Sequence, residues 1–440
     1  MAPQFLREKL RGRYVLQKTI GSTGWLVLDR LVRLGVGLVV NVWVARYLGP
    51  ANFGLLNFAI AFVALFSIFS NLGLQGVIVR DLVTHPGERE ALLGGALFLR
   101  LIGSVLAVVC AVAVVYFLRP GNGQSREVVA ILALALVPQA WDVIDYDYQA
   151  QINSRPIVII RNLSFLVCSA AKAILIVAGG SVVGFAWITA AETGLSAALM
   201  INLARVKKEL PRMAKTTSAQ LRHLLRTCWP LVVTGLSVLL YWRIDQVMLG
   251  QIIGDAGVGV FSAAVRVSEV WYFIPLAISS SVAPAMTAIY QRSKSEYLRT
   301  LLAAMQYQVW LGVAIALIFT IWGAPLIHAL FGPGYVQAGA ILAIHGWAGI
   351  FVAVGVFASG WFVNRGLLRY SMYQTFAGAV CNISLNLILI PRFGGIGAAI
   401  ATVVSQMVST VLLNAVFREC RELFRIQILS WVPGYRLPAP

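Results

Sequence analysis

The chain has 440 residues, of which 59% are hydrophobic and only 12% are charged, and its formal net charge at pH 7 is +18. Soluble domains carry about 25% charged residues, so this composition excludes an ordinary soluble protein and indicates a polytopic membrane protein. The positive charge does not indicate nucleic-acid binding, because no recognition motif or basic soluble domain accompanies it, whereas the cytoplasmic loops of membrane proteins are commonly basic.

Cysteine and histidine show no arrangement that would hold a metal ion or a disulfide framework. The five cysteines and four histidines are scattered, and no CxxC or HExxH spacing occurs. We therefore expect no metal site and no bound cofactor. The start of the chain is basic and amphipathic and lacks the apolar core of a cleavable signal peptide, so we expect the first membrane-spanning helix to serve as the insertion signal.

Apolar stretches of about 20 residues, the length of one bilayer-spanning helix, recur along the whole chain. Twelve helices are predicted, at residues 24–47, 51–76, 90–118, 127–149, 157–178, 181–204, 225–249, 255–285, 298–323, 336–363, 370–391 and 394–417. The fourth pattern is interrupted by three aspartates in its second half. Short connections, many with Gly or Pro, separate the helices, except for one longer connection after the sixth.

The longer connection divides the predicted helices into two sets of six. We predict an all-α integral membrane protein with two parallel six-helix lobes and a central cavity between them. Its predicted parts are a basic N-terminal segment at 1–23, an N-lobe at 24–204, a linker at 205–224, a C-lobe at 225–417 and a basic C-terminal tail at 418–440. Lysine and arginine are concentrated in the first segment, the linker and the tail. Both termini and the linker are therefore predicted to be cytoplasmic.

Two stretches of the N-lobe align without gaps with stretches of the C-lobe. The first match pairs Gly49, Ala51, Gly54, Leu55 and Ala59 with Gly254, Ala256, Gly259, Val260 and Ala264, at a constant offset of 205 residues. The second pairs Gly184, Ala186, Thr189 and Ser196 with Gly397, Ala399, Thr402 and Ser409, at an offset of 213 residues. Because each half has an even number of helices, the repeats are parallel, and this symmetry predicts a substrate site between the halves near mid-membrane.

Charged side chains inside the predicted helices indicate function, because an ionised group at membrane depth costs about 3 kcal/mol or more unless it faces a helix bundle or a water-filled cavity. On the first helix, Arg30, Arg33, Gly37 and Asn41 recur at steps of three and four residues and form one polar stripe. The residues predicted to line the substrate cavity are Arg30, Arg33, Asn41, Arg100, Lys172, Arg243 and Arg266. A surplus of guanidinium groups suits a diphosphate, which arginine binds in bidentate fashion.

Four acidic side chains also lie inside the predicted helices. The residues predicted to couple an ion or to form ion pairs are Asp29, Glu192, Asp245 and Glu269. Asp29 with Arg33, and Arg266 with Glu269, have the spacing of neighbours on a helix, so structural ion pairs are the alternative to a binding role. The intramembrane basic residues exceed the acidic ones by six to four, and this excess favours a binding role for the set.

Asp142, Asp145 and Asp147 crowd the second half of the fourth helix, near its predicted cytoplasmic end. Solvation at the membrane surface is a sufficient explanation for such a cluster. The alternative is a cytoplasmic gate, in which Asp142 and Asp145 pair with Arg80 or Arg155 on the same side.

Two runs of sequence resemble a known family. They are RYLGPANFGLLNFAIAFVALFSIFSNLGLQGVIVR at residues 46–80 and RIDQVMLGQIIGDAGVGVFSAAVRVSEVWYFIP at residues 243–275. Both resemble the Wzx-type polysaccharide-unit flippases of the MOP transporter superfamily, and the resemblance extends over most of the chain. It implies a MATE-like fold of two V-shaped six-helix lobes around a cationic cavity. By position, it implies that Arg30, Arg33, Arg243 and Arg266 face that cavity.

The resemblance also implies a function. Members of the family move a lipid-linked oligosaccharide, usually on undecaprenyl diphosphate, from the cytoplasmic to the outer leaflet of the bacterial cytoplasmic membrane for surface polysaccharide assembly. The partners that it implies are membrane lipids, glycosyltransferases and a polysaccharide polymerase. Related lipid II flippases generally have two further C-terminal helices, so the end of this chain soon after the twelfth helix favours the polysaccharide branch.

Two other functions are weighed against a flippase. A MATE-like cation-coupled antiporter of drugs or metabolites would use Asp29 as its coupling carboxylate, but a cationic drug would prefer a net acidic cavity. A membrane polymerase or ligase would need catalytic residues on an outer loop, and the predicted outer loops are short, so we predict no enzyme activity and no catalytic residues. Sodium ions, protons and the membrane potential all stay open as the driving force.

Overall fold

The structure of the chain is a computed structural model, which describes residues 4–211 and 216–436, with side chains from residue 33 onward. Within these residues the regular secondary structure is helical throughout. Ten helical segments of the described chain are long and apolar enough to cross a membrane. Two of them, Arg33–Thr84 and Leu368–Val416, each contain two of the predicted spans. The prediction of an all-α membrane protein with about twelve spans is confirmed.

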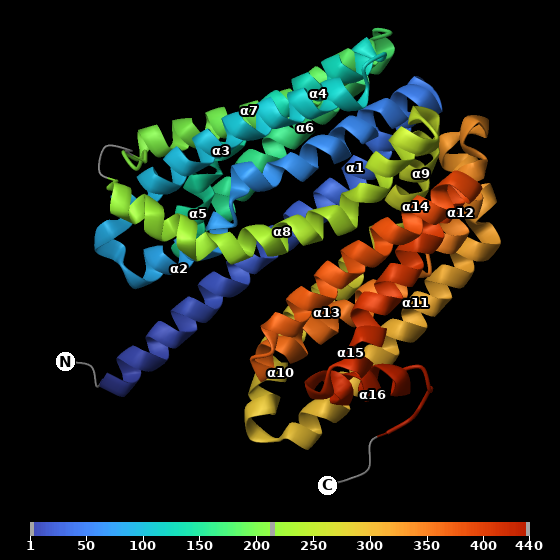
Figure 1. Cartoon of the computed structure of the whole chain (residues 1–440). Helices are drawn as coiled ribbons and strands as arrows, with labels where there is room; N and C mark the ends of the chain where they lie inside the picture. The colour runs from blue at the N-terminus through green and yellow to red at the C-terminus, as the bar shows by residue number, and fades with distance from the viewer. Residues whose placement is uncertain (1–3, 212–215, 437–440) are drawn as a thin grey trace. The chain divides into compact units, whose positions relative to one another are not determined.

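The helices follow one another along the chain as labelled in Figure 1. They are α1 (Gln4–Asn71), α2 (Leu74–Thr84), α3 (Arg89–Leu118), α4 (Gly123–Leu134), α5 (Val143–Ala150), α6 (Arg155–Val177), α7 (Val182–Val206), α8 (Ser218–Ile252), α9 (Asp255–Ser268), α10 (Phe273–Arg292), α11 (Lys294–Phe331), α12 (Gln337–His345), α13 (Ala348–Arg365), α14 (Leu368–Met407), α15 (Leu413–Val416) and α16 (Arg421–Leu429). Short helical turns join several of them, among them η2 (Pro138–Asp142), η4 (Val270–Tyr272) and the π-helical segment η6 (Val408–Leu412).

The chain forms two compact units. Unit 1 comprises Met1–Val44 and Phe62–Leu236, and unit 2 comprises Ala45–Ala61 and Ser237–Pro440. In unit 1, α4 packs on α3 and α7, and α7 packs on α6; in unit 2, α11 packs on α12 and α13, and α13 packs on α14. Each unit is treated by itself below.

These boundaries differ from the predicted lobes, which divide at the linker 205–224. α8 is one continuous helix, and the boundary between the units falls inside it. Leu224 and Cys228, near its start, are buried in a hydrophobic cluster of unit 1 together with Leu74 and Ile78. The division follows this packing rather than the loop.

Two helices of unit 2 cross at glycine residues, and this close contact holds residues 45–61 in that unit. Gly49 and Gly254, which the repeat pairs, adopt nearly the same left-handed backbone conformation, with φ values of 68° and 83°, and only glycine adopts it without strain. The helices that follow them meet at Gly54 and Gly259. A Cβ atom on Gly54 would lie 1.7 Å from the Asp255 carbonyl oxygen, and one on Gly259 would lie 2.0 Å from that of Pro50. This reciprocal contact supports the duplication read from the sequence.

Several predicted spans are broken inside the membrane-length segments. The fourth, predicted at 127–149, divides into α4, the turn η2 and α5, because Pro138 has no N–H to continue the helical hydrogen bonding. The eighth divides at η4 between α9 and α10, and the tenth divides between α12 and α13. Such breaks free backbone groups and turn side chains inward, toward the interior of a unit.

The C-terminal tail, predicted as a basic cytoplasmic segment at 418–440, is folded onto unit 2 over its described part. Leu423 and Ile426 of α16 are buried in the main hydrophobic cluster of that unit. Glu422 forms ion pairs with Lys294 and Arg365. Burial raises the pKa of the Cys420 thiol to about 11, so this cysteine is uncharged and unreactive at neutral pH.

Candidate functional site

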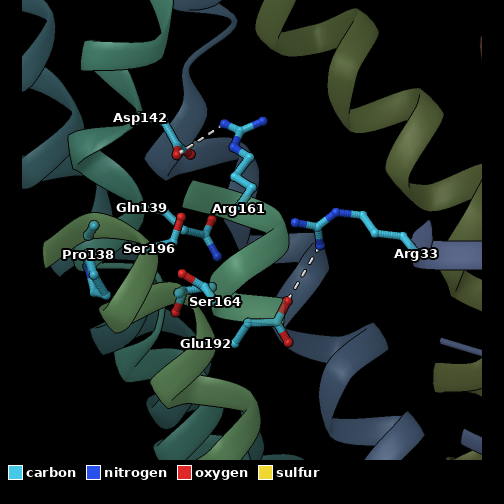
Figure 2. A pocket seen from close by; sticks show the side chains of 10 residues that line it. Arg33, Pro138, Gln139, Asp142, Arg161, Ser164, Glu192 and Ser196 are labelled. Atoms are coloured by element: carbon cyan, nitrogen blue, oxygen red, sulfur yellow. Dashed lines mark hydrogen bonds and ion pairs between the residues drawn. The ribbon is translucent and has the colours of Figure 1, made fainter. Parts of the chain in front are cut away.

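Unit 1 contains a polar cavity of about 360 Å³, built from α1, η2, α6 and α7 (Figure 2). Its lining residues are Arg33, Pro138, Gln139, Asp142, Arg161, Ser164, Glu192, Thr193, Ser196 and Ala197. The break at Pro138 brings Gln139 and Asp142 to the cavity wall. The volume falls within the roughly 300–1,000 Å³ that is typical of ligand sites.

Arg33 reaches this cavity from α1. Its guanidinium group lies 3.6 Å from the Glu192 carboxylate and 5.1 Å from the centre of the Phe165 ring, and its side chain is one-third exposed. Gly37 lies against the same ring. A Cβ atom added to Gly37 would lie 3.6 Å from Cζ of Phe165. Two members of the stripe predicted on the first helix, Arg33 and Gly37, therefore face α6 of unit 1. Asn41, one turn further, donates a hydrogen bond to the Gly37 carbonyl oxygen.

The side chains of Asp29 and Arg30 lie outside the described part of the structure. Lys172 is half-buried on α6 and lies near Cys168 and Glu192. These positions place Lys172 on the same side of unit 1 as the pocket, though it is not one of the residues that line it.

Arg161 joins the acidic cluster to the pocket. It forms ion pairs with Asp142 at 3.4 Å and with Asp145 at 3.0 Å (Figure 2 shows the first). The sequence analysis missed Arg161, although it lies inside the predicted helix 157–178. The signal was its spacing of three from Ser164 and seven from the buried Cys168, which puts the three on one helix face.

The solvation interpretation of the aspartate cluster is wrong for two of its members. Asp145 and Asp147 are only 5% and 4% exposed, and a buried carboxylate needs a partner. Asp147 accepts two hydrogen bonds of 2.7 Å from Arg89, a bidentate pair within unit 1. The helix break at η2 turns these carboxylates inward, which the sequence pattern did not indicate.

One expected gate partner, Arg80, is exposed and pairs with its neighbour Asp81 at 2.8 Å. Arg155 is an exposed residue at the start of α6. Asp142 forms ion pairs with Arg100 and Arg161, and Asp145 forms one with Arg161. The gate stays a prediction.

Arg100 does not line the pocket, in contrast to its predicted role. It is fully buried and donates hydrogen bonds to the Tyr146 hydroxyl and, at 3.0 Å, to the Asn71 amide oxygen; it also lies 3.5 Å from the Asp142 carboxylate. All of these groups belong to unit 1. Its charge is therefore used inside the protein, where it ties α3 to η2 and α5.

Unit 2 carries a second polar centre, at Asp245 on α8. The Asp245 carboxylate is 6% exposed and accepts hydrogen bonds from the Asn386 amide and, at 2.8 Å, from the Thr402 hydroxyl, both on α14. Asn386 also donates to Asn382 at 3.0 Å, and its own amide oxygen is buried without a hydrogen-bond partner among the described residues. Asp245 borders a cavity of about 30 Å³, which has room for one occupant the size of a water molecule.

The remaining predicted cationic residues of unit 2 gather around Glu269. Arg243 and Arg266 both lie close enough to act electrostatically on its carboxylate. Arg266 also donates a hydrogen bond of 3.4 Å to Asn57. Among the residues with described side chains, no group of three or more His, Cys, Asp and Glu residues is arranged to hold a metal ion.

The charges of the unit 1 pocket balance. Arg33 and Arg161 face Asp142 and Glu192 across it, so the positive surplus predicted for the cavity is not a property of this pocket. A partly exposed ion pair at 3.6 Å, such as Arg33 with Glu192, is worth about 1 kcal/mol or less.

The fold is shared with solved transporters. A multidrug resistance MATE family transporter of the MOP superfamily, in an inward-facing conformation, matches with a TM-score of 0.72 and 19% identity over 93% of this chain and 100% of its own. The lipid II flippase MurJ, in an inward closed conformation, matches with a TM-score of 0.70 and 14% identity over 94% of this chain and 91% of its own. The chain therefore has the fold of the MOP superfamily and is a multi-pass membrane protein.

Sequence comparison gives the family. The model described as polysaccharide biosynthesis protein matches residues 20–290, and that described as MatE matches residues 230–388. The chain belongs to the polysaccharide biosynthesis protein family. The resemblance to the polysaccharide-unit flippases of the MOP superfamily is thereby confirmed.

Two curated relatives match most of the chain. The probable low-salt glycan biosynthesis flippase Agl15 of Haloferax volcanii is 23% identical, and an uncharacterized membrane protein of Methanocaldococcus jannaschii is 21% identical; each match covers 88% of this chain and 81% of the relative. The capsular polysaccharide biosynthesis protein CapF of Staphylococcus aureus is 22% identical over 38% of this chain and 43% of its own.

Proposed function

We propose that this protein flips undecaprenyl-diphosphate-linked oligosaccharide units from the cytoplasmic to the outer leaflet of the bacterial cytoplasmic membrane, by alternating access, for surface polysaccharide assembly. The observation that carries the proposal is the family match over residues 20–290, and the names of the relatives, which include flippases of glycan biosynthesis, support it. Both termini and the connection between α7 and α8 lie on the cytoplasmic side in this proposal. The glycosyltransferases that supply the substrate and the polymerase that consumes it are the proposed partners.

Arg33 is the proposed diphosphate ligand. Its pair with Glu192 is loose, its side chain is one-third exposed, and the cavity beside it holds Arg161 and several hydroxyl groups. A diphosphate carries more charge than a carboxylate and accepts two parallel hydrogen bonds from one guanidinium group. In the proposed bound state the diphosphate replaces Glu192 on Arg33, and the lipid tail stays in the bilayer.

Replacing Arg33 tests this role. We expect Arg33→Ala to weaken binding of undecaprenyl diphosphate to the purified protein by about tenfold or more, the effect of losing one charge-assisted pair. Arg33→Lys should be intermediate, because an ammonium group cannot bind in bidentate fashion. Arg222→Ala is the control, since Arg222 is exposed and lines no described pocket.

The same variants are scored for surface glycan in cells. Unchanged binding and unchanged surface glycan in Arg33→Ala, at normal expression, would contradict the diphosphate role.

The Asp245 centre is the proposed coupling site. A buried carboxylate surrounded by the oxygens of Asn382, Asn386 and Thr402 has the ligand chemistry of a small hard cation such as Na⁺. Rotation of the Asn386 amide would turn its unpartnered oxygen toward Asp245, an arrangement that an intervening cation or a proton on Asp245 would stabilise. A proton on Asp245 is the other coupling species that fits this centre.

A second candidate function is cation-coupled antiport of drugs or metabolites. The specific observation that favours it is the balanced charge of the unit 1 pocket, where Asp142 and Glu192 offer carboxylates to a cationic substrate. Proteoliposomes loaded with ethidium distinguish the two functions. Efflux that depends on Glu192, together with the absence of undecaprenyl diphosphate binding, would favour the antiporter.

A further inference from the structure

Unit 2 contains a second pocket, of about 230 Å³, between α8, α13, α14 and η6. No charged side chain is among its lining residues in the described part of the chain, in contrast to the pocket of unit 1. Its wall combines the aromatic side chains of Tyr241 and Trp242 with serine, threonine and glutamine side chains. The volume is below the roughly 300–1,000 Å³ of sites for drug-sized ligands, so it suits a group the size of one sugar ring.

The two pockets occupy equivalent places in the duplicated halves. At the offset of 213 residues, Thr193, Ser196 and Ala197 of α7 correspond to Gln406, Ser409 and Thr410, and all six line their respective pockets. The charged residues of unit 1 have neutral counterparts. At the offsets of the two repeat matches, these pairs are Arg33 with Val238, Arg161 with Gln374 and Glu192 with Ser405. Val238 and Gln374 also line the unit 2 pocket.

A π-helical segment shapes the unit 2 pocket. Ser409 and Thr410 lie on η6, and their hydroxyl groups both donate to the Gln406 carbonyl oxygen, at 3.3 Å and 2.6 Å. π-Helical segments are rare and occur frequently at functional sites, because they cost backbone hydrogen bonding. The neighbouring helices pack closely against η6. A Cβ atom on Gly378 would lie 2.7 Å from Cβ of Ser409, and one on Gly355 would lie 3.0 Å from Cγ2 of Thr410.

Two side chains of this pocket suit a sugar ring. Gln406 is 8% exposed and lines the pocket, where its amide can both donate and accept hydrogen bonds. Trp242 is 44% exposed and packs edge-on against Tyr272, which leaves part of its indole ring open.

We infer that the unit 2 pocket binds an uncharged sugar ring of the transported glycan. This inference rests on the proposed flippase function. The Ser359 and Thr375 hydroxyls donate to carbonyls of their own helices, so their oxygens can accept hydrogen bonds from sugar hydroxyls. Gln406 supplies both a donor and an acceptor, and Trp242 supplies an apolar face for the ring.

The absence of charge in the lining also defines specificity. A sugar carboxylate would lose hydration without meeting a cation, and this cost disfavours uronic acids at this subsite. The pocket therefore selects neutral rings over acidic rings of the same size.

The test compares ligands with and without a sugar. The probes are undecaprenyl diphosphate, the same lipid carrying one neutral hexose, and the same lipid carrying one hexuronate, each titrated against the purified full-length chain in nanodiscs. We expect wild type to bind the hexose probe more tightly than the other two. Trp242→Ala and Gln406→Ala should each weaken binding of the hexose probe about tenfold, the effect of losing one stacking or hydrogen-bonding partner, and should leave binding of bare undecaprenyl diphosphate unchanged.

Matched variants separate binding from folding. Trp322→Ala is the control, because Trp322 is 62% exposed on α11 of the same unit and lies outside the pocket. Trp242→Phe should retain most of the affinity, because a ring is kept, and Gln406→Asn should be intermediate.

The two proposals fail in different ways. If Trp242→Ala and Gln406→Ala bind all three probes like wild type, or weaken all three equally, the sugar subsite is wrong and the flippase proposal stands. If wild type does not bind bare undecaprenyl diphosphate, and Arg33→Ala changes nothing, the flippase proposal is wrong and the subsite fails with it.

Discussion

Arg33 and Arg100 carry the same charge inside apolar helices of unit 1, yet they meet different surroundings. Arg33 is one-third exposed at a pocket and faces one carboxylate at 3.6 Å. Arg100 is fully buried and is surrounded by the Asp142 carboxylate and the side chains of Asn71 and Tyr146. A fully buried guanidinium group whose contacts are all internal stabilises the fold, whereas one that lines a pocket can also contact a ligand there.

Arg100→Ala is therefore expected to act on stability rather than on ligand binding. The variant loses three internal contacts and leaves Asp142 with Arg161 alone, and removing one partner of such a buried pair costs about 3 kcal/mol. Thermal unfolding in detergent measures the loss, and Arg222→Ala is the control, because Arg222 is exposed and has no ion pair among those described above. Equal melting temperatures for the two variants would refute the structural role of Arg100.

At the scale of elements, the helices that begin after Gly49 and Gly254 cross at Gly54 and Gly259 with almost no space between their backbones. Small residues allow such close approach between membrane helices, where packing is a main source of association. This crossing explains why residues 45–61 belong to unit 2 although they lie in the N-terminal half of the sequence.

Gly54→Ala should destabilise unit 2 by about 1–3 kcal/mol, because the added methyl group would overlap the Asp255 carbonyl and force the helices apart. Gly35→Ala, in the helical stretch of α1 that precedes the kink at Gly49, is the control, since nothing lies within 4 Å of its added Cβ. In that control the better helix propensity of alanine gives a neutral or slightly stabilising change. The measurement compares the melting temperatures of the Gly54→Ala and Gly35→Ala variants. Equal values would mean that the helices do not cross as closely as the structure shows.

The C-terminal helix α16 is a second element whose role depends on packing. Leu423→Ala should cost about 2–4 kcal/mol, because Leu423 is fully buried in the main hydrophobic cluster of unit 2. Ile428→Ala, on the exposed side of the same helix, should change stability little. Similar melting temperatures for both variants would show that α16 is not part of the folded core.

For the whole molecule, duplication supplied two equivalent pockets whose chemistry then diverged. Unit 1 retains the charged residues Arg33, Arg161 and Glu192, whereas the equivalent positions in unit 2 are neutral. The buried Asp245 centre borders Tyr241, Trp242 and Gln406, which also line the neutral pocket of unit 2. An occupant at Asp245 therefore shares walls with the sugar subsite, and such shared walls are a physical route for coupling.

Asp245→Asn tests the coupling proposal. If Na⁺ binds this centre of the folded protein, NaCl should raise the melting temperature of wild type above that in an equal concentration of choline chloride. The corresponding gain in unfolding free energy is about 2.7 kcal/mol at a hundredfold excess over Kd. The variant should lose that response, and Glu192→Gln, in unit 1, should keep it. A full sodium response in Asp245→Asn would exclude this centre as the sodium site; a pH response in place of a sodium response would assign a proton.

The spans, the duplication and the family could be predicted from the sequence alone. The length of an apolar stretch identifies a bilayer span. The constant spacing of matched residues such as Gly49 and Gly254 indicates the duplication, and the runs at 46–80 and 243–275 carry the family resemblance. All three are properties of contiguous residues. Arg33 was selected for the same reason, because a charge inside an apolar helix is visible in one segment of sequence.

Only the tertiary structure decided which of these charges line a pocket and which are enclosed among internal partners. It paired Asp147 with Arg89, enclosed Arg100, brought Arg161 to the pocket and folded α16 onto unit 2. Each of these outcomes depends on contacts between helices far apart in the chain and on breaks such as the one at Pro138. The electrostatic role of a buried charge is set by its partners in space, and a single sequence does not specify those partners.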